Sequence, residues 1–133
     1  MRMNKKESER LLEELRETFD IESKIGSSSS TKEEIDRLEA IAKAGSPIAE
    51  YDIGMCFLNG TNRERNEKIA FQWFDRCRKH ASADLQIKLC YQYFQAGMLK
   101  EADDCVERGV KDDPDTMLYA YRQMKMEDES HNA

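Results

Sequence analysis

The chain has 133 residues, enough for one modest domain with a single hydrophobic core. Hydrophobic residues are 39% of it and charged residues 36%, a profile typical of a helical protein with heavily solvated outer faces. The net charge of −6 argues against general nucleic-acid binding, because phosphate contacts supply most of that affinity. No apolar run approaches the roughly 20 residues that span a membrane, and the polar start MRMNKKESERLL is unlike a secretory signal. We therefore expect an intracellular, cytoplasmic protein without membrane insertion.

The N-terminal segment, residues 1–25, is expected to be an amphipathic helix. From residue 4 onward, apolar residues recur at three- and four-residue steps between Glu and Arg. The apolar residues expected to dock on another surface are Leu12, Leu15 and Phe19. GSSSS at residues 26–30 predicts a flexible Gly/Ser linker, either natural or an engineered join.

Residues 31–126 predict six further helices and no strand. Thr31 and Glu34 form a capping box at the start of the first of them, and Gly45 ends it. Ser46 with Pro47 begins the next, which stops at residues 59–60. The later helices are expected to begin at Asn66, Ser82, Leu99 and Asp113. Residues 127–133 are expected to be a disordered tail.

Four cysteines form no CxxC pair, and no pair of histidines lies near them in the sequence. We therefore expect no zinc site and no other metal or cofactor. Each cysteine falls on the apolar side of an expected helix, which is typical of reduced core thiols in a reducing compartment. The four are Cys56, Cys77, Cys90 and Cys105.

Between residues 44 and 77, small residues and aromatics are spaced as a pair of packed antiparallel helices would need them. This pattern resembles the Sel-1-like repeat, a relative of the tetratricopeptide repeat. The matching residues are Ala44, Gly45, Ala49, Gly54, Gly60, Lys68, Ala70, Trp73, Phe74 and Cys77. The chain departs from the family pattern at Ile69, where the family has lysine, and at Cys77, which replaces a common alanine. Its loop also lacks the usual glycine-valine and aspartate.

A second unit fits tetratricopeptide spacing through Ala83, Cys90, Tyr93, Ala102 and Pro114. The resemblance covers about residues 44–114, and half-repeats at both ends would extend it to residues 31–126. It implies an all-α fold: a short right-handed α-α solenoid preceded by the N-terminal amphipathic helix. Stacked helix pairs bury apolar stripes that one pair alone cannot bury, and the end helices cover the stack.

The resemblance also implies a binding face, because the first helix of each pair lines the concave side of such stacks. The apolar residues expected there are Tyr51, Met55, Leu58, Ile87, Tyr91 and Phe94. The polar residues expected to flank them are Asp52, Asn59, Lys88 and Gln95. The alternative is that this aromatic stripe belongs to the core, as stripes at helical spacing usually do.

The function expected from these patterns is that of a protein–protein interaction adaptor or scaffold, which binds a peptide or helix of a partner. The alternative is a small regulatory or chaperone-like protein that sequesters a partner's hydrophobic segment, with the N-terminal helix as a displaceable pseudo-ligand. Residues 4–25 could also dock on the repeats in cis or across a homo-oligomer. We expect no enzyme: Cys77 and His80 are three residues apart, but Cys77 belongs to a buried stripe. The chain could also be one piece of a longer solenoid.

Overall fold

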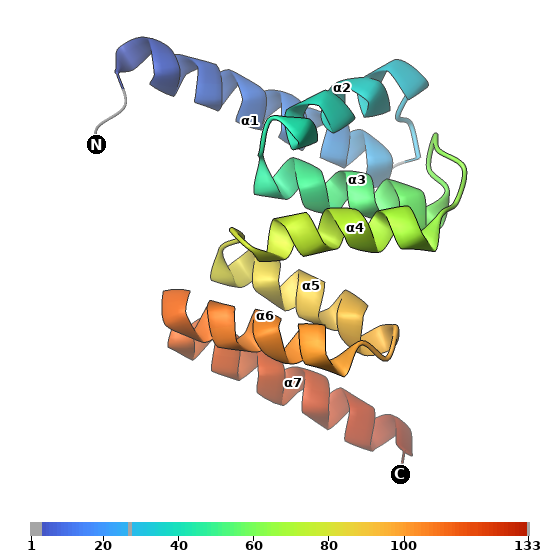
Figure 1. Ribbon diagram of the computed structural model, residues 1–133, viewed down its shortest axis with the longest axis vertical. Coiled ribbons are helices and arrows are strands. Elements are labelled where there is room, and N and C mark those ends of the chain that lie inside the picture. Colours follow the sequence, from blue (N-terminus) through green and yellow to red (C-terminus); the bar gives the residue numbers. More distant parts are fainter. Residues whose placement is uncertain (1–3, 27, 133) are drawn as a thin grey trace. The chain divides into compact units, whose positions relative to one another are not determined.

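The computed structural model of the protein describes residues 4–26 and 28–132, with the side chains of all but residues 125 and 127–132. All regular structure in these residues is helical, so the all-α class expected from the sequence is confirmed. The helices are α1 (Lys5–Gly26), α2 (Lys32–Lys43), α3 (Pro47–Asn59), α4 (Glu67–Arg78), α5 (Ala83–Gln95), α6 (Leu99–Asp112) and α7 (Pro114–Asn132) (Figure 1). Among the described residues, no helix combines the length and the apolar character needed to cross a membrane.

The helices divide into two compact units, the first ending at Arg76 and the second beginning at Cys77, near the end of α4. The first unit contains α1, α2, α3 and most of α4, and the second contains α5, α6 and α7. Each unit is described in turn.

Most helix starts follow the capping residues in the sequence. The Thr31 hydroxyl accepts a hydrogen bond from the Glu34 N–H at 3.2 Å, and the Glu34 carboxylate accepts one from the Thr31 N–H at 3.1 Å. Asn66 Oδ1 accepts from the Ile69 N–H at 3.0 Å. Ser82 is different, because its side chain makes no capping bond at the start of α5. Asp112 Oδ2, from the end of α6, accepts the Ala83 N–H there at 2.8 Å.

The core of the first unit lies between α1, α2, α3 and α4. Its buried residues are Ile21, Ile35, Leu38, Ile41, Ala42, Ala49, Ile53, Cys56 and Trp73. Helix α1 therefore enters this core through its C-terminal half. Arg63, in the loop after α3, donates to Asp36 and Glu39 of α2 at 2.8 and 2.9 Å, so the loop is tied to α2.

In the second unit, α5 packs on α6, and α7 packs against both. Leu89, Tyr93, Cys105 and Met117 are fully buried there. Gly109 of α6 lies so close to Met117 that a Cβ at position 109 would overlap the Met117 sulfur. The apolar stripes of the three helices thus form the centre of this unit.

Backbone hydrogen bonds occur in the segment between α1 and α2, where a flexible linker was expected at residues 26–30. Gly26 belongs to the last turn of α1. The N–H groups of Ser28 and Ser29 donate to the carbonyls of Ile25 and Lys24 at 3.1 and 2.8 Å. Position 27 lies outside the described residues, but those around it form a hydrogen-bonded turn.

Helix α7 is longer than expected. We predicted that the final helix would end near Met126 and that residues 127–133 would form a disordered tail, but the backbone of α7 is helical to Asn132. The sequence after Pro114 contains no further Gly or Pro to end a helix, and Met, Lys and Glu are good helix formers. Ala133 lies outside the described residues.

Asp104 of α6 joins two arginines of the second unit. Arg78 Nη1 donates to its carboxylate at 2.5 Å and Arg108 Nε at 2.7 Å. Burial alone would raise the pKa of Asp104, but the hydrogen bonds from Arg108 and Arg78 outweigh it and hold the pKa below its ordinary value of 3.8.

This carboxylate gives a prediction for pH dependence. A carboxyl group whose pKa is lowered by folding stabilises the native state above its unfolded pKa, and the contribution is lost as pH falls through the folded pKa. We expect Asp104→Asn to lower the free energy of unfolding by about 1 kcal/mol at pH 7. The difference from the unsubstituted protein should shrink as pH falls below 4. Urea unfolding of both proteins between pH 2 and 7 would measure it, and a difference independent of pH would contradict the assignment.

Candidate functional site

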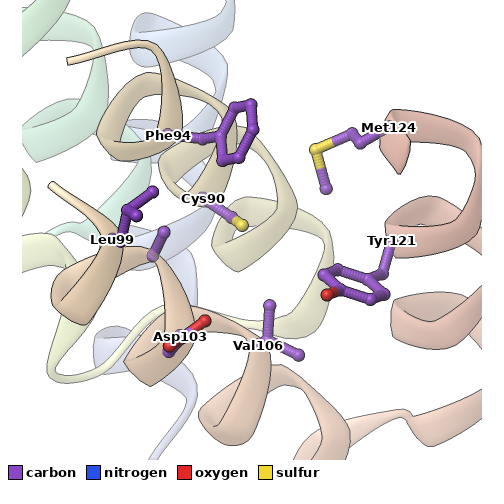
Figure 2. Close-up of a pocket in the computed structure, with 8 residues that line it drawn as sticks. Cys90, Phe94, Leu99, Asp103, Val106, Tyr121 and Met124 are labelled. Atoms are coloured by element: carbon purple, nitrogen blue, oxygen red, sulfur yellow. The ribbon is translucent and has the colours of Figure 1, made fainter. Parts of the chain in front are cut away.

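Three helices of the second unit surround an apolar hollow of about 280 Å³ (Figure 2). The lining residues are Cys90 and Phe94 of α5, Leu99, Ala102, Asp103 and Val106 of α6, and Tyr121 and Met124 of α7. A cavity of about 150 Å³ is enough to hold benzene, so this hollow has room for one or two apolar side chains.

Helical periodicity explains why these residues face one space. Cys90 and Phe94 are four residues apart on α5, and Tyr121 and Met124 are three apart on α7. The four α6 residues follow the i, i+3, i+4, i+7 pattern of a single helix face. Three such faces meet here, and Figure 2 shows side chains from all of them directed toward the same space.

Apolar surface is left open to solvent at this hollow. Phe94 is 47% exposed and Leu99 is 57% exposed, although both line it. Tyr91, one turn before Phe94 on α5, is also exposed. Contiguous exposed apolar surface is characteristic of a place where another molecule binds.

The hollow carries one negative charge, the carboxylate of Asp103, whose side chain is exposed. Burial raises the pKa of the Cys90 thiol to about 11, and the nearby Asp103 charge contributes to the increase. The site therefore combines an apolar cavity with a carboxylate at its edge, an arrangement that suits an apolar group with a cation close to it.

Of the residues predicted for a binding face on α5, only Phe94 lines the hollow. Lys88, Tyr91 and Gln95 are exposed and Ile87 is half-buried, while Gln95 Nε2 donates to the Tyr91 hydroxyl at 2.7 Å.

The residues predicted on α3 belong to the first unit. Tyr51, Met55 and Leu58 are half-buried, and Asn59 is exposed. Asp52 is not the exposed flanking residue that we expected, because it is buried. Asp52 lies one turn before the core residue Cys56, so it is on the inner side of α3. Its negative charge contributes to the raised pKa of the Cys56 thiol.

The predicted docking residues of α1 lie on its surface. Leu12 is 54% exposed, Leu15 is 37% exposed and Phe19 is 53% exposed. The buried residues of α1 are Thr18 and Ile21 instead, and Ile25 packs against the core beside them. The Thr18 hydroxyl donates to the Glu14 carbonyl at 2.7 Å, which satisfies it inside the helix. Helix α1 thus packs on α2 and α3 by one face and leaves a second apolar face open.

The cysteines are placed as core residues. Burial is the main cause that raises the pKa of Cys56 to about 11 and of Cys105 to about 12, and Cys77 is fully buried. Thiols with such pKa values carry very little thiolate at pH 7 and are poor nucleophiles. Among the described residues, no group of three or more His, Cys, Asp or Glu side chains is placed to hold a metal ion.

No protein-family model, curated protein or solved structure matches the chain. The resemblance to Sel-1-like and tetratricopeptide repeats therefore stays a prediction from the residues quoted above. What the structure defines is an all-helical protein whose second unit carries an apolar hollow between three helices.

Proposed function

We propose that the chain is a non-enzymatic protein–protein interaction adaptor that holds an apolar peptide or helix of a partner in the hollow of α5, α6 and α7. The observation that carries the proposal is the exposure of Phe94 and Leu99 on the wall of a cavity that is otherwise mostly apolar. Covering apolar surface of this kind contributes about 25 cal/mol for each Å² removed from water.

The size of the hollow supports a side-chain anchor. Sites for small molecules and cofactors usually have volumes of about 300–1,000 Å³, and this one has about 280 Å³. One or two apolar side chains of a partner would fill it, with Asp103 available to a Lys or Arg one helical turn from the anchor. Recognition of a helix by such anchors is a common binding mode.

The solenoid architecture is part of the same proposal. Its support is the packing of α2 on α3 and of α5 on α6 within their units, with a short turn inside each pair. Gly45 and Gly97 adopt φ of 105° and 74° in these turns, a conformation that other residues rarely take. An intracellular location also belongs to the proposal, and its support is that all four cysteines are free and buried.

The test is selection of peptides from a random displayed library on the full chain, followed by affinity measurement with labelled peptides. We expect selected peptides to carry an apolar anchor near a Lys or Arg, with dissociation constants in about the micromolar range. Phe94→Ser should weaken binding about tenfold or more, since it removes an apolar wall of the hollow.

Tyr119→Ser is the matched control, because Tyr119 is an exposed aromatic residue of the same unit that does not line the hollow. It should leave the affinity unchanged. Peptides that bind Phe94→Ser as tightly as the unsubstituted chain, or a selection that yields no apolar peptide, would refute the proposed site.

A further inference from the structure

Helix α1 carries an apolar face that nothing in the described chain covers. Leu11, Leu12, Leu15 and Phe19 are all exposed large apolar residues of this helix. The N-terminal half of α1 runs beyond α2 and α3, as Figure 1 shows. The face is distinct from the one that packs in the core through Ile21, because side chains advance by about 100° per residue around a helix.

This face consists of two rows that repeat every seven residues, in which Ser8 and Glu22 are half-buried and the other members are exposed. Lys5, Leu12 and Phe19 form one row, and Ser8, Leu15 and Glu22 form the other. Rows with these spacings are the two seam positions of a heptad, at which two helices pack side by side. The seam is thus apolar in the middle, positively charged at its N-terminal end and negatively charged at its C-terminal end.

The charges of this face are available for a partner. Within the described residues, Lys5, Glu9, Arg16 and Glu22 make no ion pair, in contrast to Glu17 and Lys24, which are paired with Arg37 and Glu34 of α2. Glu9 and Arg16 lie in the row beside the seam, seven residues apart, where flanking charges of paired helices meet.

An antiparallel second copy of α1 complements the charged positions and the central apolar positions of this face. When Leu12 of one copy packs against Leu15 of the other, the same register brings Lys5 opposite Glu22 and Ser8 opposite Phe19. In the flanking row it brings Glu9 opposite Arg16. Every contact occurs twice because the arrangement has twofold symmetry. A parallel pair would instead place Lys5 against Lys5 and Glu22 against Glu22, which is repulsive.

We propose that the protein forms a homodimer through an antiparallel pairing of α1, with the seam of Lys5, Ser8, Leu12, Leu15, Phe19 and Glu22. The partner of this face is a second copy of the chain, selected by charge complementarity along the seam. The inference uses the first unit only and is independent of the proposed peptide site on the second.

The interface is short. Residues 5–22 span about 27 Å at 1.5 Å per residue, and a pair of such helices has an interface near the lower end of the sizes found for specific complexes. We therefore expect a dissociation constant in about the micromolar range. Sedimentation equilibrium over a wide concentration range should show a monomer–dimer equilibrium, and a monomer at all concentrations up to about 1 mM would overturn the proposal.

Charge reversal tests the pairing. Arg16→Glu would place carboxylates opposite one another at both symmetric positions, and should weaken dimerisation about tenfold or more. Glu9→Arg combined with Arg16→Glu restores opposite charges at both positions and should restore the affinity. Arg10→Glu is the control: it makes the same substitution on the opposite side of α1, where the residue is exposed. A dimer unaffected by Arg16→Glu, or one not restored by the double reversal, would overturn the proposal.

The direction of the helices is tested with a spin label on Lys6→Cys, a position outside the seam. In the antiparallel register the two labelled positions lie about 22 Å apart along the helix axis, whereas a parallel pair would place them level along the axis. The native cysteines are all buried, so labelling is directed to the exposed position 6. The longer separation supports the proposal, and the shorter one overturns it.

Discussion

Gly54→Ala is expected to destabilise the first unit by about 1–3 kcal/mol, the usual cost of overpacking a well-packed core. A Cβ at position 54 of α3 would lie 2.6 and 2.8 Å from two ring carbons of Phe74, and 3.2 Å from the carbonyl oxygen of Ala70. The ring has little freedom to move away, because Phe74 is fully buried. Its centroid is 5.7 Å from that of Tyr51 and 5.1 Å from that of Phe71.

Helix propensity acts in the opposite direction but is the smaller effect. Alanine is favoured over glycine in a helix interior by about 1 kcal/mol. At position 54 the new methyl group would lie closer to a fully buried ring than side-chain carbons approach, and it would also contact a backbone carbonyl of α4. We therefore expect a net loss of stability. This is also why a glycine occurs in the middle of α3 despite its cost in helix stability.

Gly26→Ala is the matched control, because a Cβ at position 26 meets no atom within 4 Å. It should be neutral or slightly stabilising. Urea unfolding followed by the fluorescence of Trp73, the single tryptophan of the chain, reports on this unit, since Trp73 lies in its core. A Gly54→Ala protein as stable as the Gly26→Ala protein would show that α3 and α4 are less closely packed than the structure has them.

Local features of this fold could be predicted from the sequence because they depend on neighbouring residues. The capping box at Thr31 and the cap at Asn66 require only side chains three residues from the backbone groups that they satisfy. The sequence predicted close packing of two helices between residues 44 and 77, and Gly54 lies at such a contact, because a Cβ there would be 2.6 Å from the Phe74 ring. The last helix continues to Asn132, past the residue at which a tail was expected to begin, and the sequence there has no Gly or Pro that would stop a helix.

The candidate site was harder to predict, because it depends on how helices face one another. Cys90, Leu99 and Tyr121 belong to the amphipathic stripes of three different helices, and nothing local indicates that these stripes leave a hollow when α7 packs on α5 and α6. Of the residues that line the hollow, only Phe94 was expected at a binding face. The i, i+3, i+4, i+7 spacing on α6 was the one available clue, but core helices have the same spacing.

The buried face of α1 was also not predicted, because it too depends on how helices face one another. The sequence showed that Leu12, Leu15 and Phe19 form an apolar face, but it could not show that Thr18 and Ile21 would be the residues buried against α2 and α3. The helix has two faces able to pack, separated by about a third of a turn. One is used within the chain, and the other carries the heptad rows on which we base the homodimer.

Tyr93→Ala is expected to lower the stability of the second unit by about 3–5 kcal/mol, as truncation of a large buried aromatic residue does. Tyr93 is one of the largest fully buried side chains of the protein, and the guanidinium of Arg78 lies 5.6 Å from its ring centroid. Removing the ring would leave a cavity in the core of α5 and α6 and would take away this cation–π contact.

Tyr91→Ala is the matched control, since it makes the same change two residues away on α5, where the side chain is exposed. It should cost less than about 1 kcal/mol. Hydrogen exchange of the α5 and α6 amides, measured by NMR, would compare the two proteins at the level of this unit. An equal loss of stability in the two variants would mean that Tyr93 is not enclosed as it is in the structure. A large loss for Tyr93→Ala alone would show that the inner face of α5 stabilises the unit. It would also show that the outer face, with Tyr91, is free for a role other than stability.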